Sequence, residues 1–422
     1  MRIYWMEVRR SPLRWWLPVL LALDFAAIFG RSQWWIGVWP QASVAAQLPS
    51  LYFGPALAAS AAWTAGRARR AGITEQLGAS ARPAWQLELA QLAATLSYGT
   101  LVYLVGAVSA AVVSVSDAGP GFLWPGYLLL GFGVMVGCAG LGHLVGRWSA
   151  SPYAASAVCG LGCFLFVAWI GGPSALDLFM LSGDPFVKVA VSPLLVRLAL
   201  GCSLAAIAVL VARPGSRLRG RVGWRATATR RFAALGAVVV FVLAAVAVGP
   251  AGPIRVQRAA ATEPLCSETA PRVCLWPEDR KYLPEATAMA GRMSKLPTGM
   301  FTVPGDFYEQ GLRSGQMNDF YILEGSLWDP AISMGSAIVH SEVPPFCDKV
   351  DRKLADRIGL ASGELSMWLA VRIYGGGRPE SMHGGPPGVD MEAVARLAAQ
   401  PEETQIAWAR QRLQTLHSVT CV

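Results

Sequence analysis

Apolar windows of about 20 residues recur along the chain up to Pro250 and then stop. A helix of about 20 residues is the length needed to cross the ~30 Å hydrocarbon core of a bilayer. Seven such windows lie at residues 13–30, 45–65, 88–115, 122–146, 153–171, 190–212 and 232–250. With a mean hydropathy of +0.40 and 15% charged residues, the chain is expected to be an α-helical polytopic membrane protein.

The change in composition at Pro250 divides the chain into two expected domains. Residues 1–250 form a transmembrane domain, and residues 251–422 have the length and polarity of a separate domain. The first part carries 19 basic and 7 acidic residues, a balance of +12, and the second carries 17 and 20, a balance of −3. The net charge of +9 therefore belongs to membrane loops, and no nucleic-acid partner is expected.

The positions of the arginines predict the orientation. Sixteen fall on alternate loops, namely Arg2, Arg9, Arg10, Arg14, Arg67, Arg69, Arg70, Arg82, Arg147, Arg213, Arg217, Arg219, Arg221, Arg225, Arg230 and Arg231. Because positive residues favour the cytoplasmic side, the N-terminus is expected in the cytoplasm and the residues after Pro250 outside. Tryptophans such as Trp15, Trp39 and Trp148 lie at the expected span ends, where an amphipathic ring favours the headgroup region. Since no clear cleavage site precedes Arg31, we expect the first span to be retained rather than removed as a signal peptide.

The cysteines divide in the same way. Four lie inside expected spans, where a thiol acts as a small apolar group: Cys138, Cys159, Cys163 and Cys202. The other four, Cys266, Cys274, Cys347 and Cys421, lie in the part expected outside, where disulfides form. Four cysteines allow three connectivities, of which we favour Cys266–Cys274 with Cys347–Cys421, mainly because the first two are close in sequence.

Three ionisable residues within the spans are candidate functional residues, because charge in hydrocarbon is costly. Asp24 in the first span is expected to pair with Arg197 in the sixth. His143 lies near the cytoplasmic end beside Arg147, so snorkelling to the interface is favoured over a proton-relay role. The glycines of the fourth span favour close helix packing over a substrate path.

Two segments have the pattern of short helices at the cytoplasmic surface. Residues 1–16 alternate apolar and charged side chains before Ser11-Pro12, as an interfacial amphipathic helix does. In the loop 67–84, Ile73, Gln76 and Leu77 share one helical face, Arg69, Arg70 and Glu75 are expected to face water or a partner, and Gly72 and Gly78 mark the ends. The simpler alternative is a loop whose arginines only set the topology.

The stretches "MEVRRSPLRWWLPVLLALDF" and "RARRAGITEQLGASARPAW" resemble the permease subunits of ABC-2 type transporters over roughly residues 1–212. Those permeases begin with an interfacial elbow helix, which corresponds here to the segment with Arg9 and Arg10. They carry a coupling helix of the form R-x-x-G-[TI]-x-E-x-L after the second span. The matching residues here are Arg69, Gly72, Ile73, Glu75 and Leu77, so the resemblance implies that these contact a cytosolic ABC ATPase.

The resemblance has further implications and one departure. Family permeases place re-entrant helices before the last core span, so an exit gate is expected at residues 171–188, an apolar segment. Such permeases have six spans with both termini inside, whereas this chain adds a seventh span and an exported domain. The excess of arginine (31) over lysine (5) fits a high-GC Gram-positive bacterium.

The exported domain is expected to be small and mainly helical or α+β. Apolar spacing predicts helices at 278–296, 354–374 and 392–416, and short apolar runs predict strands at 273–276, 300–303 and 336–340. Five aromatic residues favour a core over a recognition surface: Phe307, Tyr308, Phe320, Tyr321 and Trp328.

No catalytic motif accompanies these segments. The sequence contains no G-x-x-x-x-G-K-[ST] phosphate loop, no H-E-x-x-H zinc motif and no G-x-S-x-G elbow. His340, Glu342, Glu364 and His383 lack the spacing of a metal or hydrolase site and are expected to be scattered surface residues. We therefore expect no enzyme activity, cofactor or metal in this chain, so that any ATPase must be another polypeptide.

The function expected from the sequence is a bacterial plasma-membrane permease subunit, with an exporter favoured. It would pair with a second permease copy, identical or not, and with two cytosolic ATPases, in contact with membrane lipid. The cargo remains open among peptides, antibiotics and lipids. The alternative is a non-transport membrane protein that anchors an exported sensor or binding domain.

Overall fold

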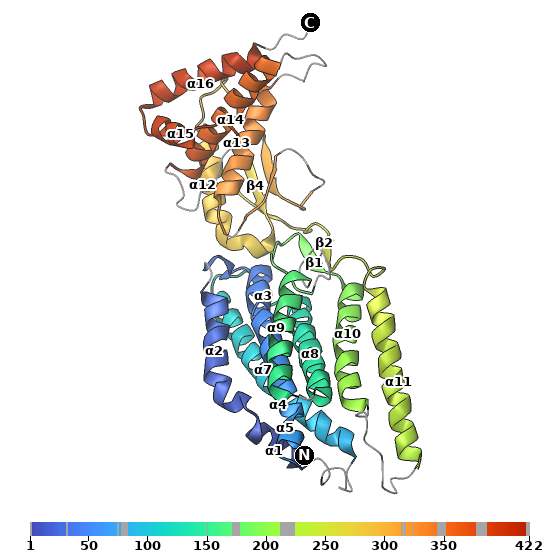
Figure 1. The fold of residues 1–422 in the computed structure, drawn as a ribbon. Helices are drawn as coiled ribbons and strands as arrows, with labels where there is room; N and C mark the ends of the chain where they lie inside the picture. Colours follow the sequence, from blue (N-terminus) through green and yellow to red (C-terminus); the bar gives the residue numbers. More distant parts are fainter. Residues whose placement is uncertain are drawn as a thin grey trace. The chain divides into compact units, whose positions relative to one another are not determined.

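A computed structural model of the chain divides into two compact units. The first comprises Met1–Ser116 with Gly121–Val256, and the second comprises Asp117–Pro120 with Gln257–Val422 (Figure 1). The structure describes residues 2–30, 33–73, 76, 83–149, 151–170, 178–211, 224–313, 315, 318–323, 325–343, 352–376 and 386–418. The division lies close to the change in composition at Pro250, but a short loop, Asp117–Pro120, clusters with the second unit.

The first unit is a bundle of helices. Its elements are α1 (Arg2–Arg10), α2 (Leu13–Phe29), η1 (Gln33–Trp35), α3 (Trp39–Gln47), α4 (Ser50–Ala65), α5 (Arg67–Arg70), α7 (Ala84–Ser114), α8 (Pro125–Trp148), α9 (Pro152–Trp169), α10 (Val191–Leu210) and α11 (Trp224–Ala247). A two-stranded sheet of β1 (Val187–Val189) and β2 (Arg255–Gln257) completes it.

Every apolar window of the sequence corresponds to helix in the structure. Within the described residues, four helices are long and apolar enough to cross a membrane, namely α7, α8, α10 and residues 229–247 of α11. The bent pair α1 and α2 adds a fifth if it counts as one span. The remaining two windows correspond to α9, which is shorter, and to the consecutive helices α3 and α4.

Prolines explain two interruptions of the helical pattern. A bend of 66° separates α1 from α2 at Ser11-Pro12. The ring of a proline disfavours the helical conformation of the residue before it, which here is Ser11. The Leu13 amide donates to the Ser11 hydroxyl at 3.3 Å, which satisfies one amide at the start of α2. Pro49, which has no N–H to donate, lies between α3 and α4 and breaks the window at 45–65 in two.

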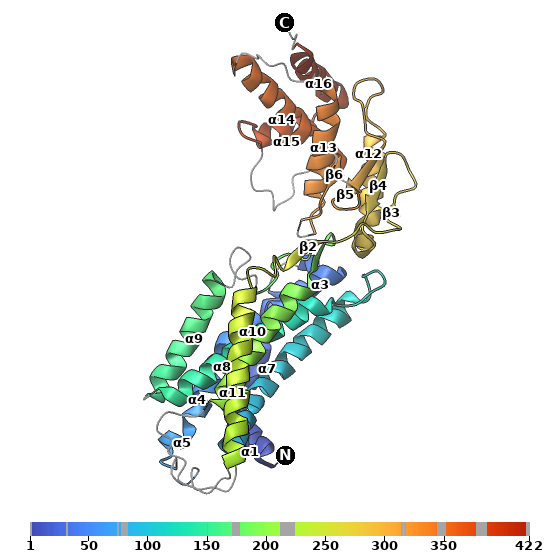
Figure 2. The ribbon, with the colours of Figure 1, turned by 90° about the vertical axis from the view of Figure 1, so that its right-hand side faces the viewer.

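Helix α8 packs so closely against its neighbours that only glycine fits at the contacts. A Cβ on Gly142 would lie 2.1 Å from the Ala58 carbonyl oxygen of α4, and one on Gly146 would lie 2.4 Å from that of Ala62. On the α10 side, a Cβ on Gly140 would lie 2.8 Å from the Cα of Ala205. The expected packing role of these glycines is confirmed, and α8 lies between α4 and α10 (Figure 2).

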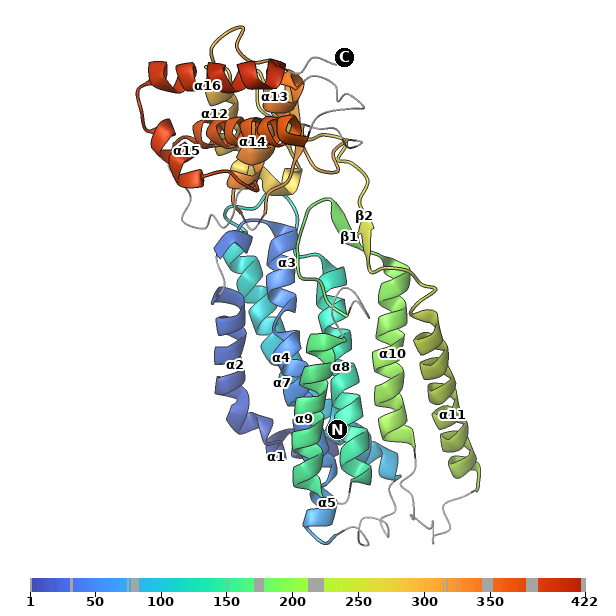
Figure 3. The same ribbon diagram turned by 45° about the horizontal axis from the view of Figure 1, so that its top comes forward.

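The second unit combines a small sheet with helices. Its sheet has the order β3 (Leu265–Cys266), β4 (Arg272–Leu275), β5 (Asp306–Glu309) and β6 (Asp319–Phe320). β3 and β4 are antiparallel, whereas β4, β5 and β6 are parallel. The helices are η2 (Pro277–Tyr282), α12 (Leu283–Met293), α13 (Trp328–Glu342), α14 (Arg352–Tyr374), α15 (Met391–Ala398) and α16 (Glu402–His417). Figure 3 shows α13, α15 and α16 around α14, which contacts each of them.

Two of the strand predictions for this unit are wrong, and two predicted helices are divided, of which 278–296 consists of η2 and α12. Residues 336–340 lie in α13, because Met334, Ala337 and Ile338 have helical spacing and form a buried face. Residues 300–303 form no ladder, whereas 273–276 largely coincide with β4. The segment 392–416 consists of α15 and α16, with Pro401 between them.

We expect Gly142→Leu to destabilise the first unit, because the added side chain has to displace the backbone of α4. Overpacking of this kind typically costs about 1–3 kcal/mol. Thermal unfolding of the purified protein in detergent measures the loss. Gly162→Leu is the matched control, because nothing lies within 4 Å of a Cβ at that position of α9. Equal melting temperatures for the two variants would contradict the close packing.

Candidate functional site

The end of the first unit where α1 and α5 lie holds most of its buried ion pairs, and we call it the α5 end (Figure 1). Arg67, the first residue of α5, pairs with Glu7 of α1, whose side chain is 3% exposed. Two tyrosines of α7 and α1 fix α1 further: Tyr4 Oη lies 2.7 Å from Ser97 Oγ, and Tyr98 Oη donates to the Val8 carbonyl at 3.0 Å. These contacts hold α1 on both α5 and α7.

Arg69 binds the last carbonyl groups of α8. Its guanidinium donates to the Gly146 oxygen at 2.7 Å and also to the Ser149 oxygen. The carbonyl groups at the end of a helix have no partner within the helix and carry partial negative charge, so an arginine stabilises them. Arg69 is thus partly buried and bonded to α8, so its guanidinium is not simply directed into water, and its contact with a partner protein stays a prediction.

Arg70 also turns inward rather than toward solvent. Its guanidinium carbon lies 3.8 Å from the centroid of the Trp63 ring, and its Nη2 donates to the Trp63 carbonyl at 2.9 Å. Tyr153 of α9 lies against the same ring in a T-shaped arrangement, at 5.1 Å between centroids. The three arginines of α5 thus connect it to α1, α8 and the α4–α9 contact.

The end of α5 is a Schellman turn. Gly72 has a φ of +67°, the Gly72 amide donates to Arg69 O at 3.1 Å, and the Ile73 amide donates to Ala68 O at 3.1 Å. Ile73 follows the turn and is 37% exposed. Glu75 and Leu77, the remaining residues of the expected coupling helix, lie outside the described residues.

The predicted amphipathic helix at the N-terminus is present as α1. Its Glu7 face packs on the bundle, whereas Arg9 and Arg10, with Arg2, Trp5 and Met6, line a shallow pocket on the other face. Cationic and amphipathic aromatic side chains on one face are typical of a helix at a membrane interface.

A second group of charges at the α5 end joins four helices. Glu88 of α7 lies 2.8 Å from His143 Nε2 and 3.3 Å from Arg147 Nε, both on α8. Arg147 also donates to the Ala208 carbonyl of α10 at 2.5 Å, and Arg230 of α11 donates to the Leu210 carbonyl at 2.8 Å. Arg230 lies within electrostatic range of Glu88, so we name these four side chains the Glu88 cluster.

The Glu88 cluster corrects the expectation for His143. The side chain is fully buried and bonded to Glu88, so it does not snorkel to the interface. Glu88 was missed because it opens the apolar window 88–115 and resembles a loop charge. A signal was available in the i, i+4 spacing of His143 and Arg147, which places both side chains on one helical face. Two buried hydrogen-bond donors on one face predict an acceptor, such as a carboxylate, on a neighbouring helix.

Asp24 and Arg197 do not form the expected pair. Neither carboxylate oxygen of Asp24 has a hydrogen-bond partner in the part of the chain that the structure describes, although the side chain is fully buried. Arg197 donates to the Pro193 carbonyl one turn earlier in α10 at 3.1 Å. The α2 helix packs mainly on α7, which explains why Asp24 does not meet α10.

A cavity of about 300 Å³ lies between α8, α9, α10 and α11. Gly133, Gly137 and Gly201 are among the residues that line it, together with Phe166 and Phe241. Arg197 is the one charged residue among those that line it, within the described residues. Such a lining suits an apolar or amphipathic molecule.

The segment at 171–188 gives a mixed result. Residues 171–177 lie outside the described residues, and residues 178–186 form no helix. Met180 is fully buried, and its amide donates to Gln47 Oε1 at 3.2 Å. The described part of the expected exit gate is therefore a loop packed against α3.

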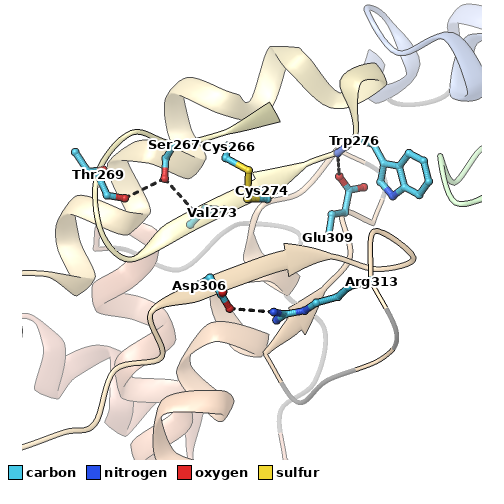
Figure 4. The surroundings of a disulfide bond; sticks show 9 residues. All are labelled: Cys266, Ser267, Thr269, Val273, Cys274, Trp276, Asp306, Glu309 and Arg313. Carbon is cyan, nitrogen blue, oxygen red and sulfur yellow. Dashed lines mark hydrogen bonds and ion pairs between the residues drawn. A yellow bond between two sulfur atoms is a disulfide. The ribbon is translucent and has the colours of Figure 1, made fainter. Parts of the chain in front are cut away.

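In the second unit, the Cys266–Cys274 disulfide is confirmed (Figure 4). It links the adjacent strands β3 and β4, and the Ser267 hydroxyl accepts from the Val273 amide at 2.9 Å beside it. Cys347 and Cys421 lie outside the described residues.

Two buried carboxyl groups lie close together near this disulfide. Glu309 of β5 is 1% exposed and accepts the Trp276 amide at 2.9 Å, and Asp279 of η2 is fully buried beside it. Burial and the Asp279 carboxyl raise the pKa of Glu309 well above its ordinary value. Burial also lowers the pKa of Lys281 to about 8, against the attraction of Asp279 and Asp117.

The residues considered for a metal or hydrolase site do not come together. Glu364 pairs with Arg412 at 2.5 Å, and Glu342 accepts the Thr302 amide at 2.6 Å. His340 is exposed, and His383 lies outside the described residues. Among the residues that the structure describes, no group of three potential ligands could hold a metal ion.

No protein-family model matches the chain, and neither a curated protein nor a solved structure matches it.

We expect Glu88→Gln to destabilise the first unit, because His143, Arg147 and Arg230 lose the only carboxylate of their cluster. Breaking one partner of a buried ion pair typically costs about 3–5 kcal/mol. The melting temperature in detergent measures the effect. Because the second change removes one uncompensated cation, Glu88→Gln with Arg147→Gln is expected to melt higher than Glu88→Gln alone. A Glu88→Gln protein that melts like the native protein would contradict the role of the cluster.

We expect Glu309→Gln to reduce the pH dependence of stability in the second unit. A carboxyl whose pKa is raised by folding contributes stability that is fully present below its unfolded pKa and is lost as pH rises through its folded pKa. Gln does not ionise and keeps an oxygen for the Trp276 amide. Hydrogen exchange of residues 272–275 and 306–309 from about pH 5 to about pH 8, corrected for intrinsic rates, measures the free energy of opening.

The native protein should lose opening free energy as pH rises, and Glu309→Gln should lose less. Glu403→Gln, a change at an exposed residue of α16, serves as the control and should follow the native protein. Identical slopes for Glu309→Gln and the native protein would overturn the assignment.

Proposed function

We propose that the chain is the membrane-spanning subunit of an ATP-driven ABC exporter of the ABC-2 type in a bacterial plasma membrane. It would act with a second permease copy and with separate cytosolic ATPases. The observation that carries the proposal is the attachment of α5, since Arg67 and Arg69 bind α1 and the end of α8. A force applied just beyond Gly72 would therefore reach several helices at once.

The arginine distribution supports the orientation that this function needs. The positive-inside bias favours a cytoplasmic α5 end, with seven spans and an exported second unit. In that orientation, Ile73 would meet a cytosolic partner. The face of α1 with Arg9, Arg10 and Trp5 would lie in the lipid headgroup region.

The core of the bundle supports a mechanism of coupled helix movement. The glycine contacts hold α4, α8 and α10 together, and the Glu88 cluster joins α7 and α11 to them at the same end. ATP-driven movement of α5 would be passed through Arg69 to α8. The cavity beside α8 would then open or close around an apolar or amphipathic part of the cargo.

The alternative is a membrane anchor for a sensor or binding domain. One observation favours it: the second unit has its own core, in which Trp276, Phe307 and Trp368 are fully buried, and its own disulfide. An exporter needs the α5 end as a docking site, whereas an anchor needs only its charges. The two functions therefore differ in whether an ATPase binds there.

Affinity purification of the tagged protein from mild detergent, followed by mass spectrometry, tests the proposal. We expect a polypeptide with a phosphate-binding Walker A motif to co-purify. We expect Ile73→Arg to abolish that association, because a cation replaces an exposed apolar contact. Insertion and melting temperature should not change, since Ile73 is partly exposed.

Leu323→Arg is the matched control, because it makes the same kind of change at a residue of the second unit that is 47% exposed. Retention of the ATPase by Ile73→Arg would contradict the docking role of this residue. Recovery of an intact protein without any ATPase would favour the anchor function.

A further inference from the structure

Asp24 is a fully buried carboxyl group in the middle of α2. Neither of its two oxygens has a hydrogen-bond partner within the described residues. The carboxyl lies against the backbone of α7, where a Cβ on Gly106 would be 2.3 Å from Asp24 Oδ2. A glycine at 106 is therefore what allows an acidic side chain into this contact.

The helices that pack on α2 bring no counter-charge to Asp24. From α7, Tyr103 lies within electrostatic range, but its hydroxyl donates to the Leu128 carbonyl at 3.2 Å. The other acid of α7, Glu88, is held by His143 and Arg147. α1 contributes Glu7, which pairs with Arg67, whereas its cations Arg2, Arg9 and Arg10 are exposed. α3 contains no titratable side chain.

An ionised carboxylate without a partner in an apolar interior has a high free energy, and binding a proton is the simplest way to remove the charge. The usual ways of stabilising the anion are an ion pair, several N–H donors or a metal ion. Within the described residues, neither oxygen of Asp24 accepts a hydrogen bond, and no group of three metal-ligating side chains is found.

We propose that Asp24 is a proton-binding site of the membrane-embedded unit, protonated while α2 is packed on α7 and ionised when water enters between these helices. Release of the proton would thus accompany the separation of α2 from α7, and uptake of the proton would accompany their packing. We assign a proton rather than a metal cation, because no group of three His, Cys, Asp or Glu side chains within the described residues could hold a metal ion. The proposal is independent of whether an ATPase drives the protein.

Infrared difference spectroscopy of the whole protein in lipid nanodiscs at neutral pH tests the proposal directly. Asp24→Asn is nearly isosteric, so the difference between the two spectra isolates this carboxyl. We expect the native protein to show an additional C=O stretching band of a protonated carboxylic acid, shifted in D2O. If Asp24→Asn instead lost only carboxylate bands, and no band of a protonated carboxylic acid, the carboxyl would be ionised in the native protein and the proposal would be overturned.

A chemical probe on the native chain gives an independent readout, in case Asp24→Asn fails to fold. Dicyclohexylcarbodiimide, an apolar reagent, takes the proton of a neutral carboxyl onto one nitrogen while the carboxyl oxygen bonds to its central carbon. The acyl group then moves from oxygen to nitrogen, so that one equivalent of reagent is added and nothing leaves. Peptide mapping by mass spectrometry locates the product.

Glu88 is the matched internal control, because it is also shielded but is paired with cations. We expect labelling at Asp24 and not at Glu88. The neutral fraction of a carboxyl falls about tenfold per pH unit once it ionises, so labelling should decrease at high pH. If sodium ions suppressed the labelling at constant pH and choline ions did not, Asp24 would be a cation site and the proposal would be overturned. Equal labelling of Asp24 and Glu88 would also overturn it.

Discussion

The close approach of α8 to α4 and α10 is the constraint on which the first unit depends. At Gly142 and Gly146 the helix meets the backbone of α4 directly, without intervening side chains. In a membrane, where lipid tails are as apolar as leucine, such close contact provides the dispersion energy that holds helices together. Sliding α8 along α4 would bring a larger side chain against the α4 backbone, so these glycines fix the register between the two helices. The polar contacts at the α5 end depend on this register.

The α5 end shows how this register positions the charged residues. α5 follows α4 in the chain. Because α8 is fixed against α4, the last carbonyl groups of α8 lie within reach of Arg69 of α5. The same turn of α8 presents His143 and Arg147 to Glu88 of α7. Each arginine of α5 thus contacts a different neighbour, so the segment acts as a junction between helices rather than as a loop that only sets topology. This junction is the physical basis of the proposed coupling to an ATPase.

The sequence predicted the helices well because the pattern for them is local. Runs of apolar residues decide where the helices lie, and each run depends on a few neighbouring residues. Pro49 and Pro401, which divide two of the predicted segments, were local signals for breaks that the apolar pattern alone did not predict. The partners of buried charges were not predictable in the same way. Asp24 and Arg197 are opposite charges within apolar windows, yet α2 packs on α7 and places the carboxyl against Gly106. Arg69 matches a family motif for an exposed helix, but its guanidinium is used within the bundle. The confirmed Cys266–Cys274 bridge was predictable because its short separation allows a hairpin-like pairing.

The buried charges of the first unit fall into two groups with different consequences for movement. Glu7, Glu88 and the arginines around them are paired, and separating such partners in a medium of low polarity is costly, so these contacts keep the helices at the α5 end together. Asp24 has no such partner, and water at the α2–α7 contact would stabilise its anion rather than disrupt a pair. Among these contacts, the one between α2 and α7 is therefore opened at the smallest electrostatic cost. If α8 moves as one body with α4 and α10, this contact is where the bundle would yield, and the charge state of one carboxyl would set how easily it does so.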